Sequence, residues 1–143
     1  MDNRIILAIR ELRENSAFAF IGSIGKRAFP QIKAMQVLEH DSLKVHLFAT
    51  YTGSDHVAEY RKNPKASVYY YAVVGGEFRG ALFTGKMEIC TDHSTKAILW
   101  RDGAGVYQPT NVSDDDYCVL KFTAETVNYY AGMDNATYRI EDM

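Results

Sequence analysis

The junction between a predicted strand and a predicted helix is the part of the sequence best suited to binding an anion. It reads Phe48-Ala49-Thr50-Tyr51-Thr52-Gly53-Ser54, so hydroxyl side chains and a glycine directly precede the helix. Free backbone N–H groups, hydroxyls and the positive end of a helix dipole meet at such a junction, and together they suit a phosphate group. The alternative is structural: Ser54 caps the helix and the threonines complete a turn.

Two basic side chains are candidates for the same anion. Lys33 shares one face of a predicted strand with Gln31 and Met35, and from a strand position its ammonium group can reach a bound anion. The alternative for Lys33 is a solvated surface lysine. His56 lies in the first turn of the helix that begins at Ser54. A cation at this end opposes the helix dipole, which disfavours it unless an anion lies nearby.

Motifs of several other chemistries are missing. No Gly-x-Gly-x-x-Gly, Walker A or Gly-x-Ser-x-Gly motif occurs, so nothing supports nucleoside triphosphate chemistry or the usual serine hydrolase plan. The histidines and cysteines lack zinc spacing, and we interpret the run 114–116 of aspartates as a solvated loop, so we expect no metal site. Cys90 and Cys118 belong to apolar runs and are expected to be structural thiols in a reducing cytoplasm.

The elements that position these residues are mostly strands. Asp2 is expected to cap the first helix, and Gly75-Gly76 marks a hairpin. Short strands that are apolar on both faces predict a small closed antiparallel barrel with peripheral helices. The periodicity predicts helices over about 2–14, 54–63 and 92–103. It predicts strands over about 17–21, 27–38, 43–50, 66–74 and 79–90, and an irregular stretch over 104–116. The chain then continues with a closing hairpin of 117–123 with 126–131 and a short strand at 138–140.

Size and composition limit the class of protein. The 143 residues predict a single domain over 1–143, and 47% hydrophobic with 24% charged residues excludes a disordered chain or a coiled coil. A net charge of −2 argues against a nucleic-acid binder. No apolar run is long enough to cross a membrane and no signal-peptide pattern opens the chain, so we expect a cytoplasmic protein with no membrane contact.

The two-sided apolar character of the strands also predicts an assembly. The consecutive tyrosines 69–71 alternate between the two faces of their strand. A barrel of this size cannot enclose all of that surface, so part of it is expected to be buried against a second copy of the chain.

Several segments, taken together in order and spacing, resemble one known family. The chain from about Ala17 to Tyr130 resembles the flavin-binding split barrels of the pyridoxamine 5′-phosphate oxidase-like group, and within it the general stress protein branch. The segments that carry the resemblance are Pro30-Gln31-Ile32-Lys33-Ala34-Met35, Leu47-Phe48-Ala49-Thr50 leading to Ser54, Arg61-Lys62-Asn63-Pro64-Lys65-Ala66-Ser67-Val68, Gly85-Lys86-Met87-Glu88, Leu99-Trp100 and Asp116-Tyr117-Cys118-Val119-Leu120-Lys121-Phe122.

This resemblance implies a mainly β protein, a six-stranded antiparallel split β-barrel with peripheral helices, that forms a homodimer and binds FMN at the dimer interface. It also implies the cofactor contacts. Lys33 stands where a basic residue contacts the flavin, and Ser54 opens the helix that faces the phosphate. The other implied contacts are the strand backbone along the ring at Ala34, Met35 and Gln36, and Thr50 at the end of the third strand.

The sequence also departs from the family pattern. Members often carry Arg-Lys after the helix-opening serine to hold the phosphate, whereas this chain has Asp55 and His56. A ring-contacting glutamine of the vitamin-forming oxidases falls near Gly80, and their C-terminal Trp and Arg have no counterparts. We therefore expect an FMN-dependent oxidoreductase for an unidentified small molecule, with no side chain assigned as acid or base, rather than a true pyridoxamine phosphate oxidase. The alternatives are a non-enzymatic module that stores flavin or haem, or an empty structural barrel.

Overall fold

Antiparallel strands make up most of the chain. The structure is a computed structural model, and it describes residues 2–38, 42–101 and 115–141. In chain order the elements are α1 (Asn3–Asn15), β1 (Phe18–Ile24), a 3₁₀ turn (Lys26–Ala28), β2 (Pro30–Gln36), β3 (Val45–Tyr51), α2 (Asp55–Lys62), β4 (Lys65–Val74), β5 (Glu77–Cys90), α3 (His93–Arg101), β6 (Tyr117–Ala131) and β7 (Asp134–Arg139).

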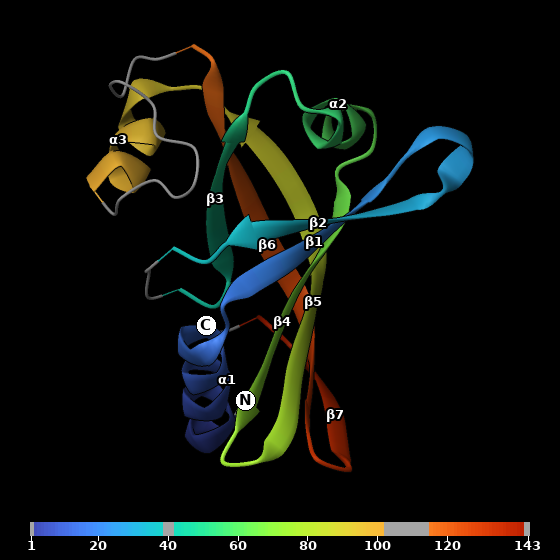
Figure 1. Cartoon of the computed structure of the whole chain (residues 1–143), viewed down its shortest axis with the longest axis vertical. Coiled ribbons are helices and arrows are strands. Elements are labelled where there is room, and N and C mark those ends of the chain that lie inside the picture. The colour runs from blue at the N-terminus through green and yellow to red at the C-terminus, as the bar shows by residue number, and fades with distance from the viewer. Residues whose placement is uncertain (1, 39–41, 102–114, 142–143) are drawn as a thin grey trace.

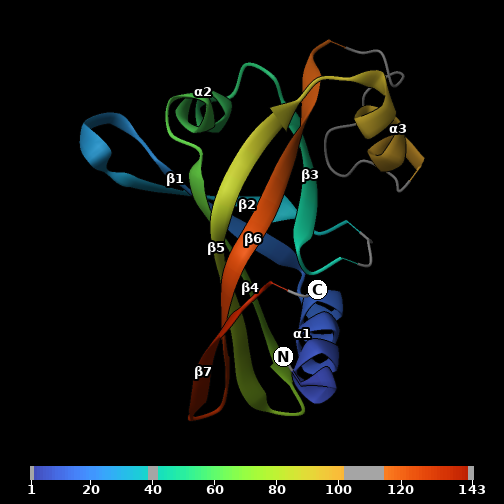
Figure 2. The ribbon, with the colours of Figure 1, turned by 180° about the vertical axis from the view of Figure 1, so that it is seen from behind.

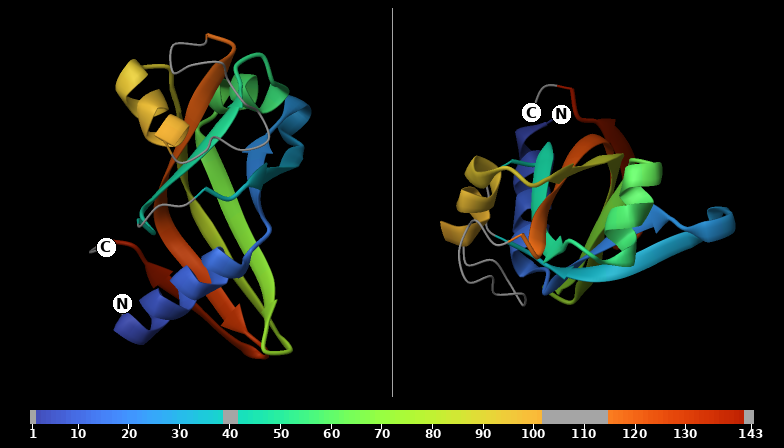
Figure 3. Two further views of the ribbon diagram at one scale, coloured as in Figure 1. Left: turned by 60° about the vertical axis from the view of Figure 1, so that its left-hand side comes forward. Right: turned by 90° about the horizontal axis from the view of Figure 1, so that it is seen from above.

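The strands form one strongly curled sheet with the order β2-β1-β4-β5-β6-β3, and β7 pairs with β6 beside this path (Figure 3). Within the described residues the end strands β2 and β3 do not pair, so the barrel is split rather than closed. The predicted split-barrel class is confirmed, with two corrections. The sheet has seven strands instead of six, and it does not close on itself.

The predicted closing hairpin is wrong, because β6 is one continuous strand of 15 residues. Along β5, Gly85 pairs with Ala124 and Thr84 pairs with Thr126, so Glu125 is an extra residue that forms a β-bulge. The carbonyl of Glu125 instead accepts a hydrogen bond from the backbone N–H of Ile140, at 3.0 Å. Gly85 is required at this point because a side chain there would overlap the backbone carbonyl of Thr123.

The β1–β2 hairpin also differs from its prediction. Strand β2 begins at Pro30 instead of Arg27, because Arg27 and Ala28 adopt positive φ angles of 58° and 61° in the turn. The hairpin projects sideways from the body of the barrel (Figures 1 and 2). Strand β1 pairs with β4 only as far as Gly22, opposite Ser67, so the residues beyond Gly22 pair with β2 alone.

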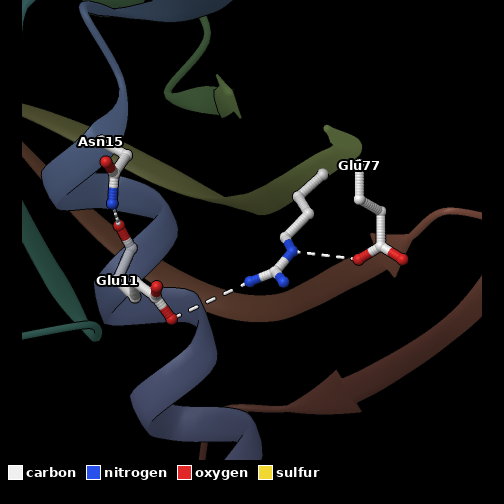
Figure 4. A network of polar contacts seen from close by, with 4 residues as sticks. Glu11, Asn15 and Glu77 are labelled. Carbon is white, nitrogen blue, oxygen red and sulfur yellow. Dashed lines mark hydrogen bonds and ion pairs between the residues drawn. The ribbon is translucent and has the colours of Figure 1, made fainter. Parts of the chain in front are cut away.

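Helix α1 packs against the end of the barrel that is remote from α2 (Figures 1 and 2). Asp2 caps it as predicted, accepting a hydrogen bond from the N–H of Arg4 at 2.7 Å. Its apolar face buries Ile9 and Leu12 against the sheet. At its edge an arginine of β5, Arg79, lies 3.8 Å from Glu11 and 3.1 Å from Glu77, which joins the helix to the β4–β5 hairpin (Figure 4).

The predicted turn at Gly75-Gly76 is confirmed, with φ angles of +59° and +79° that glycine adopts without strain. The predicted helix after position 92 is α3, and Asp92 caps it by accepting a hydrogen bond from the Thr95 N–H at 2.9 Å. Its predicted end near Gly103 and most of the predicted irregular stretch lie outside the described residues.

A polar group lies at the centre of the apolar core. His46 is fully buried, and both of its ring nitrogens have partners. Nδ1 is 2.8 Å from the Tyr70 hydroxyl and Nε2 is 2.7 Å from the Leu43 carbonyl. Because both groups are satisfied, the histidine fixes the relative positions of β3 and β4 without an unpaired polar atom.

Candidate functional site

Strands β1 and β2 and the first two turns of α2 enclose a hollow of about 220 Å³, which we call the β2–α2 hollow. In the ribbon view, α2 lies on the same side of the barrel as the projecting end of the β1–β2 hairpin (Figure 1). Its walls carry cationic, anionic and amide side chains together. They are Ile21, Ser23, Gln31, Ile32, Lys33, Asp55, His56 and Glu59.

Strand register places Lys33 in this hollow. Lys33 pairs with Ile21 of β1, whose side chain is buried in the barrel, so both side chains lie on the inner face of the sheet. Because β2 is an end strand, this part of the inner face is open and Lys33 remains exposed. Lys33 therefore lines the hollow together with Asp55 and His56 of α2, while its side chain stays exposed as in the solvated alternative, and its contact with an anion stays a prediction.

The three other residues predicted at the strand–helix junction form a hydrogen-bonded cluster. Thr50 Oγ1 is 2.8 Å from His56 Nε2 and 3.4 Å from Ser54 Oγ. Ser54 occupies the N-cap position of α2, but its hydroxyl donates to the Tyr51 carbonyl and makes no capping bond. The structural alternative therefore holds in part: Ser54 is the N-cap residue, but its side chain closes the preceding turn instead of capping α2. The first N–H groups of α2 are left for another acceptor.

Burial and neighbouring charges determine the protonation of His56. Burial lowers its pKa below the usual value, and the nearby Lys33 ammonium lowers it further. The carboxylates of Glu59 and Asp55 act in the opposite direction with smaller effect. His56 is consequently a neutral hydrogen-bonding group at pH 7, not a replacement for a charged lysine.

Two residues at the hollow's α2 side were missed by the sequence analysis. Glu59, which lines the hollow, accepts a hydrogen bond at Oε1 from the Ser23 hydroxyl at 2.7 Å, which fixes the carboxylate against β1. The next residue, Tyr60, lies outside the lining, and its hydroxyl donates to the Gly22 carbonyl at 2.9 Å. The one sequence signal was the spacing of four residues between Asp55 and Glu59, which places their two carboxylates on the same face of the helix.

The remaining predicted residues lie further along β2 and do not line this hollow. Ala34 is on the outer face of the sheet opposite Phe20, and Met35 is buried in the barrel opposite Ala19. Gln36 is exposed at the end of the strand, opposite Phe18. These three positions form a line that leads away from Lys33, along the unpaired edge of β2.

The chemistry of the hollow fits a phosphate monoester. The Lys33 ammonium and the first N–H groups of α2 supply donors to it, whereas the Ser54 hydroxyl already donates to the Tyr51 carbonyl and Thr50 Oγ1 is engaged with His56. The Asp55 and Glu59 carboxylates oppose an anion, and Ser23 already occupies one oxygen of Glu59. The donor set can therefore hold a phosphate, with less positive charge than an Arg-Lys pair would give.

The packing on the outer face of the sheet explains why this chain has no glutamine near Gly80. The hydroxyls of Tyr69 and Tyr130 are 2.7 Å apart above this glycine. A Cβ atom at Gly80 would lie 2.5 Å from the Tyr69 hydroxyl and 2.6 Å from Cζ of Tyr130. The tyrosine pair fills the space that a longer side chain at Gly80 needs, so the two features exclude each other.

The described part of the chain contains no group of three or more His, Cys, Asp or Glu side chains placed to hold a metal ion. None of the helices in the same residues has the length and apolar character needed to cross a bilayer.

Comparison with known proteins identifies the family. The chain has 37% sequence identity, over 99% of both chains and with a TM-score of 0.85, to a Clostridium acetobutylicum protein related to general stress protein 26 of the pyridoxinephosphate oxidase family. Two neighbours at 12% identity share the fold. A pyridoxamine 5′-phosphate oxidase-related, FMN-binding protein of Nostoc punctiforme has a TM-score of 0.74, with 94% of this chain and 90% of that chain covered. A haem-binding protein of Mycobacterium smegmatis has a TM-score of 0.73, with 92% and 57% covered.

No curated protein matches the sequence. The sequence pattern of the pyridoxamine 5′-phosphate oxidase family, in contrast, matches residues 6–131, which include the β2–α2 hollow and every strand of the main sheet path. The chain therefore belongs to the pyridoxamine 5′-phosphate oxidase family.

Proposed function

We propose that the chain binds FMN and acts as a flavin-dependent oxidoreductase on a small molecule. The observation that carries this proposal is the convergence of Lys33 from β2 with His56 from α2 in one hollow. Thr50 and Ser54 adjoin it through the hydrogen bonds of the cluster. Family membership and the shared fold of the FMN-binding Nostoc protein support the same ligand.

Each residue has a defined task in this proposal. Lys33 offsets the charge of the phosphate, and the first N–H groups of α2 donate to it. Neutral His56 holds the Thr50 hydroxyl in place through their 2.8 Å contact. The backbone of Ala34, Met35 and Gln36, at the free edge of β2, lies along the flavin ring. Bound flavin supplies the redox chemistry, and the protein supplies orientation and electrostatics.

The same proposal includes a homodimer with the cofactor at its interface. The outer face of β1, β4 and β5 carries a continuous apolar row, because Phe20 pairs with Tyr69 and Tyr69 pairs with Leu82. Ile32 on β2 and Phe78 on β5 extend it and are 77% and 60% exposed. An apolar patch that spans several strands is typical of a protein–protein interface. Light scattering should give twice the chain mass of 16.2 kDa, and the single-chain mass would contradict the dimer.

A flavin or haem store is the alternative function. The haem-binding neighbour supports it only through the shared fold. Of the described histidines, His46 has both ring nitrogens engaged, His56 has Nε2 at Thr50, and His93 is exposed on α3 and does not line the hollow. No described histidine therefore presents a free Nε2 in the hollow. Flavin is therefore the better fit to the side chains.

The test is the visible spectrum of the purified protein, followed by titration of the cofactor-free protein with FMN and with riboflavin. Flavin bands and tighter binding of FMN than of riboflavin are expected, because only FMN carries the phosphate. A Soret band would favour the haem alternative, and binding of neither flavin would refute the proposal. Anaerobic reduction of the bound flavin by NADH or NADPH separates an oxidoreductase from a store.

We also propose that the protein works in the cytoplasm. Cys90 and Cys118 are both free and buried. Burial raises the pKa of the Cys90 thiol to about 11, and it raises that of Cys118 as well. Unreactive thiols of this kind fit a reducing compartment.

A further inference from the structure

A second, larger hollow lies beside the β2–α2 hollow. It measures about 490 Å³ and lies between the tip of the β1–β2 hairpin and α2; we call it the adjoining groove. The two spaces share Gln31, Asp55 and Glu59 as lining residues. A ligand that fills both must therefore pass over these three side chains, from the phosphate beside Lys33 to the groove.

One face of α2 forms the length of this groove. Asp55, Glu59 and Lys62 line it and recur at helical spacing, so they lie along a single face. Seven residues of helix separate the first from the last, a distance of roughly 10 Å at 1.5 Å per residue. The groove thus runs along α2 from Asp55 to Lys62, beside the tip of the hairpin.

The chemistry of the groove is that of a nucleotide site. Three cations line it, Lys26 and Arg27 from the hairpin tip and Lys62 from α2, and they outnumber its two carboxylates, Asp55 and Glu59. The ring of Phe29 is 56% exposed, and the Arg27 guanidinium carbon lies 5.4 Å from its centroid. Cations suit a second phosphate, and an exposed ring beside an arginine is a stacking surface for a flat base.

The tip that carries these groups is pre-formed. The Gly25 N–H donates to the Phe29 carbonyl at 2.8 Å, and the Phe29 N–H donates to the Lys26 carbonyl at 3.2 Å. Arg27 and Ala28 are held at positive φ, a conformation that costs free energy in residues other than glycine. A turn that holds such strain sets the direction of the Arg27 and Phe29 side chains before a ligand arrives.

We propose that the adjoining groove binds the AMP half of FAD, so that the chain prefers FAD to FMN. This inference rests on the proposed function, because the flavin phosphate must occupy the β2–α2 hollow. In the proposed complex the second phosphate lies among the groove cations, and the adenine stacks on Phe29. The AMP part of a pyridine dinucleotide has the same chemistry, but only in FAD is it joined to the phosphate beside Lys33.

The test compares FMN and FAD binding to cofactor-free protein by isothermal titration calorimetry. Wild-type protein should bind FAD about tenfold or more tightly than FMN, the effect expected of one base stacked on an aromatic ring. Phe29→Ala and Lys62→Met should each reduce this preference while FMN affinity stays unchanged. The control is Arg4→Met, which removes the charge of an exposed side chain on α1 and should keep the preference for FAD.

Each other outcome has a distinct meaning. Equal affinity for FMN and FAD would overturn the groove assignment and leave the proposed function intact. Binding of neither flavin would overturn both. If FAD has no advantage but free AMP binds the FMN-loaded protein and Phe29→Ala abolishes that binding, the groove holds a separate nucleotide and its assignment to FAD is wrong.

Discussion

Replacing Lys33 by methionine tests the charge that the β2–α2 hollow offers to a phosphate. The substitution removes the ammonium and keeps a flexible side chain on β2. Lys33 is exposed, so its attraction to a bound phosphate is partly screened. Two unit charges about 4 Å apart interact by about 1 kcal/mol in water and about 4 kcal/mol at an effective dielectric constant of 20. A value near the lower end, about 1–2 kcal/mol, corresponds to a roughly 5- to 30-fold loss of FMN affinity.

Flavin fluorescence titration measures this loss. Riboflavin lacks the phosphate, so its affinity should be the same for wild type and Lys33→Met. The Arg4→Met control removes an equal charge from a side chain that is 91% exposed, at the opposite end of the barrel. It should leave FMN affinity unchanged. Added salt should weaken FMN binding to wild type more than to Lys33→Met, because screening acts on the charge that the variant lacks.

The same variant gives a second measurement that needs no cofactor. The Lys33 ammonium is one cause of the lowered His56 pKa, so Lys33→Met should raise that pKa in the cofactor-free protein. NMR titration of the His56 ring protons measures it. FMN affinity within twofold of wild type, or an equal loss for riboflavin, would refute the placement of the phosphate. An unchanged His56 pKa would refute the proximity of Lys33 itself.

Three further predictions concern stability. Gly85→Ala places a methyl group against the backbone of Thr123 at the bulge and should lower the free energy of unfolding by about 1–3 kcal/mol. In circular dichroism melts this corresponds to a Tm lower by roughly 3–10 °C. The control is Gly53→Ala, whose new methyl group contacts only the Tyr51 ring and which should melt like wild type. His46→Phe leaves the buried Leu43 carbonyl without its ring partner and should lower the free energy of unfolding in urea by about 1–3 kcal/mol. The loss should exceed that of Tyr70→Phe, which removes only one hydrogen bond. Equal losses for the two variants would contradict this role of His46. Hydrogen bonds from Thr95 and Ser94 lower the pKa of Asp92 to about 2, so the capping contribution is complete above the ordinary Asp pKa and is lost as pH falls through about 2. NMR should show that midpoint and its rise in Thr95→Ala, and an Asp92 midpoint near 4 in wild type would count against the cap.

Local signals predicted much of the fold. Asp2 marks a helix start through a side chain that accepts a backbone N–H, and Gly75-Gly76 marks a turn that needs positive φ. For the third helix the sequence offered Thr91 or Asp92 as the cap, and the structure shows that it is Asp92. Each of these signals lies within a few residues of the feature that it determines. Such features can be read from the chain without knowing what packs against them.

Features that depend on distant partners were missed. The break predicted near Glu125 is a bulge, and it arises from the Gly85 backbone of β5, 40 positions away in the sequence. The late start of β2 follows from positive φ at Arg27 and Ala28, which carry no glycine signal. A propensity-based reading assigns such residues to the strand, because only the tertiary structure imposes the turn.

The residues of the candidate site were likewise predictable from the sequence, whereas their interactions were not. Residue chemistry at the strand–helix junction and the family resemblance both led to Lys33, Thr50, Ser54 and His56, and the structure brings these four together. It did not predict that burial keeps His56 neutral, or that Ser23 binds Glu59 beside it. Both depend on the approach of α2 to β1, and no residue spacing along the chain encodes that approach.

The projecting β1–β2 hairpin has a mechanical consequence. Beyond Gly22 it projects as a free arm, since β1 has left β4. Among the described residues, two side-chain hydrogen bonds, Ser23 to Glu59 and Tyr60 to Gly22, join its base to α2. From Gly22 to Gly25 the arm is roughly 10 Å long at about 3.3 Å per residue. A rotation of about 10° at the base therefore moves the tip by roughly 2 Å, which is enough to break or make a stacking contact at Phe29. The arm turns about these two hydrogen bonds, so a small change at Glu59 or Tyr60 produces a larger displacement at the Phe29 ring.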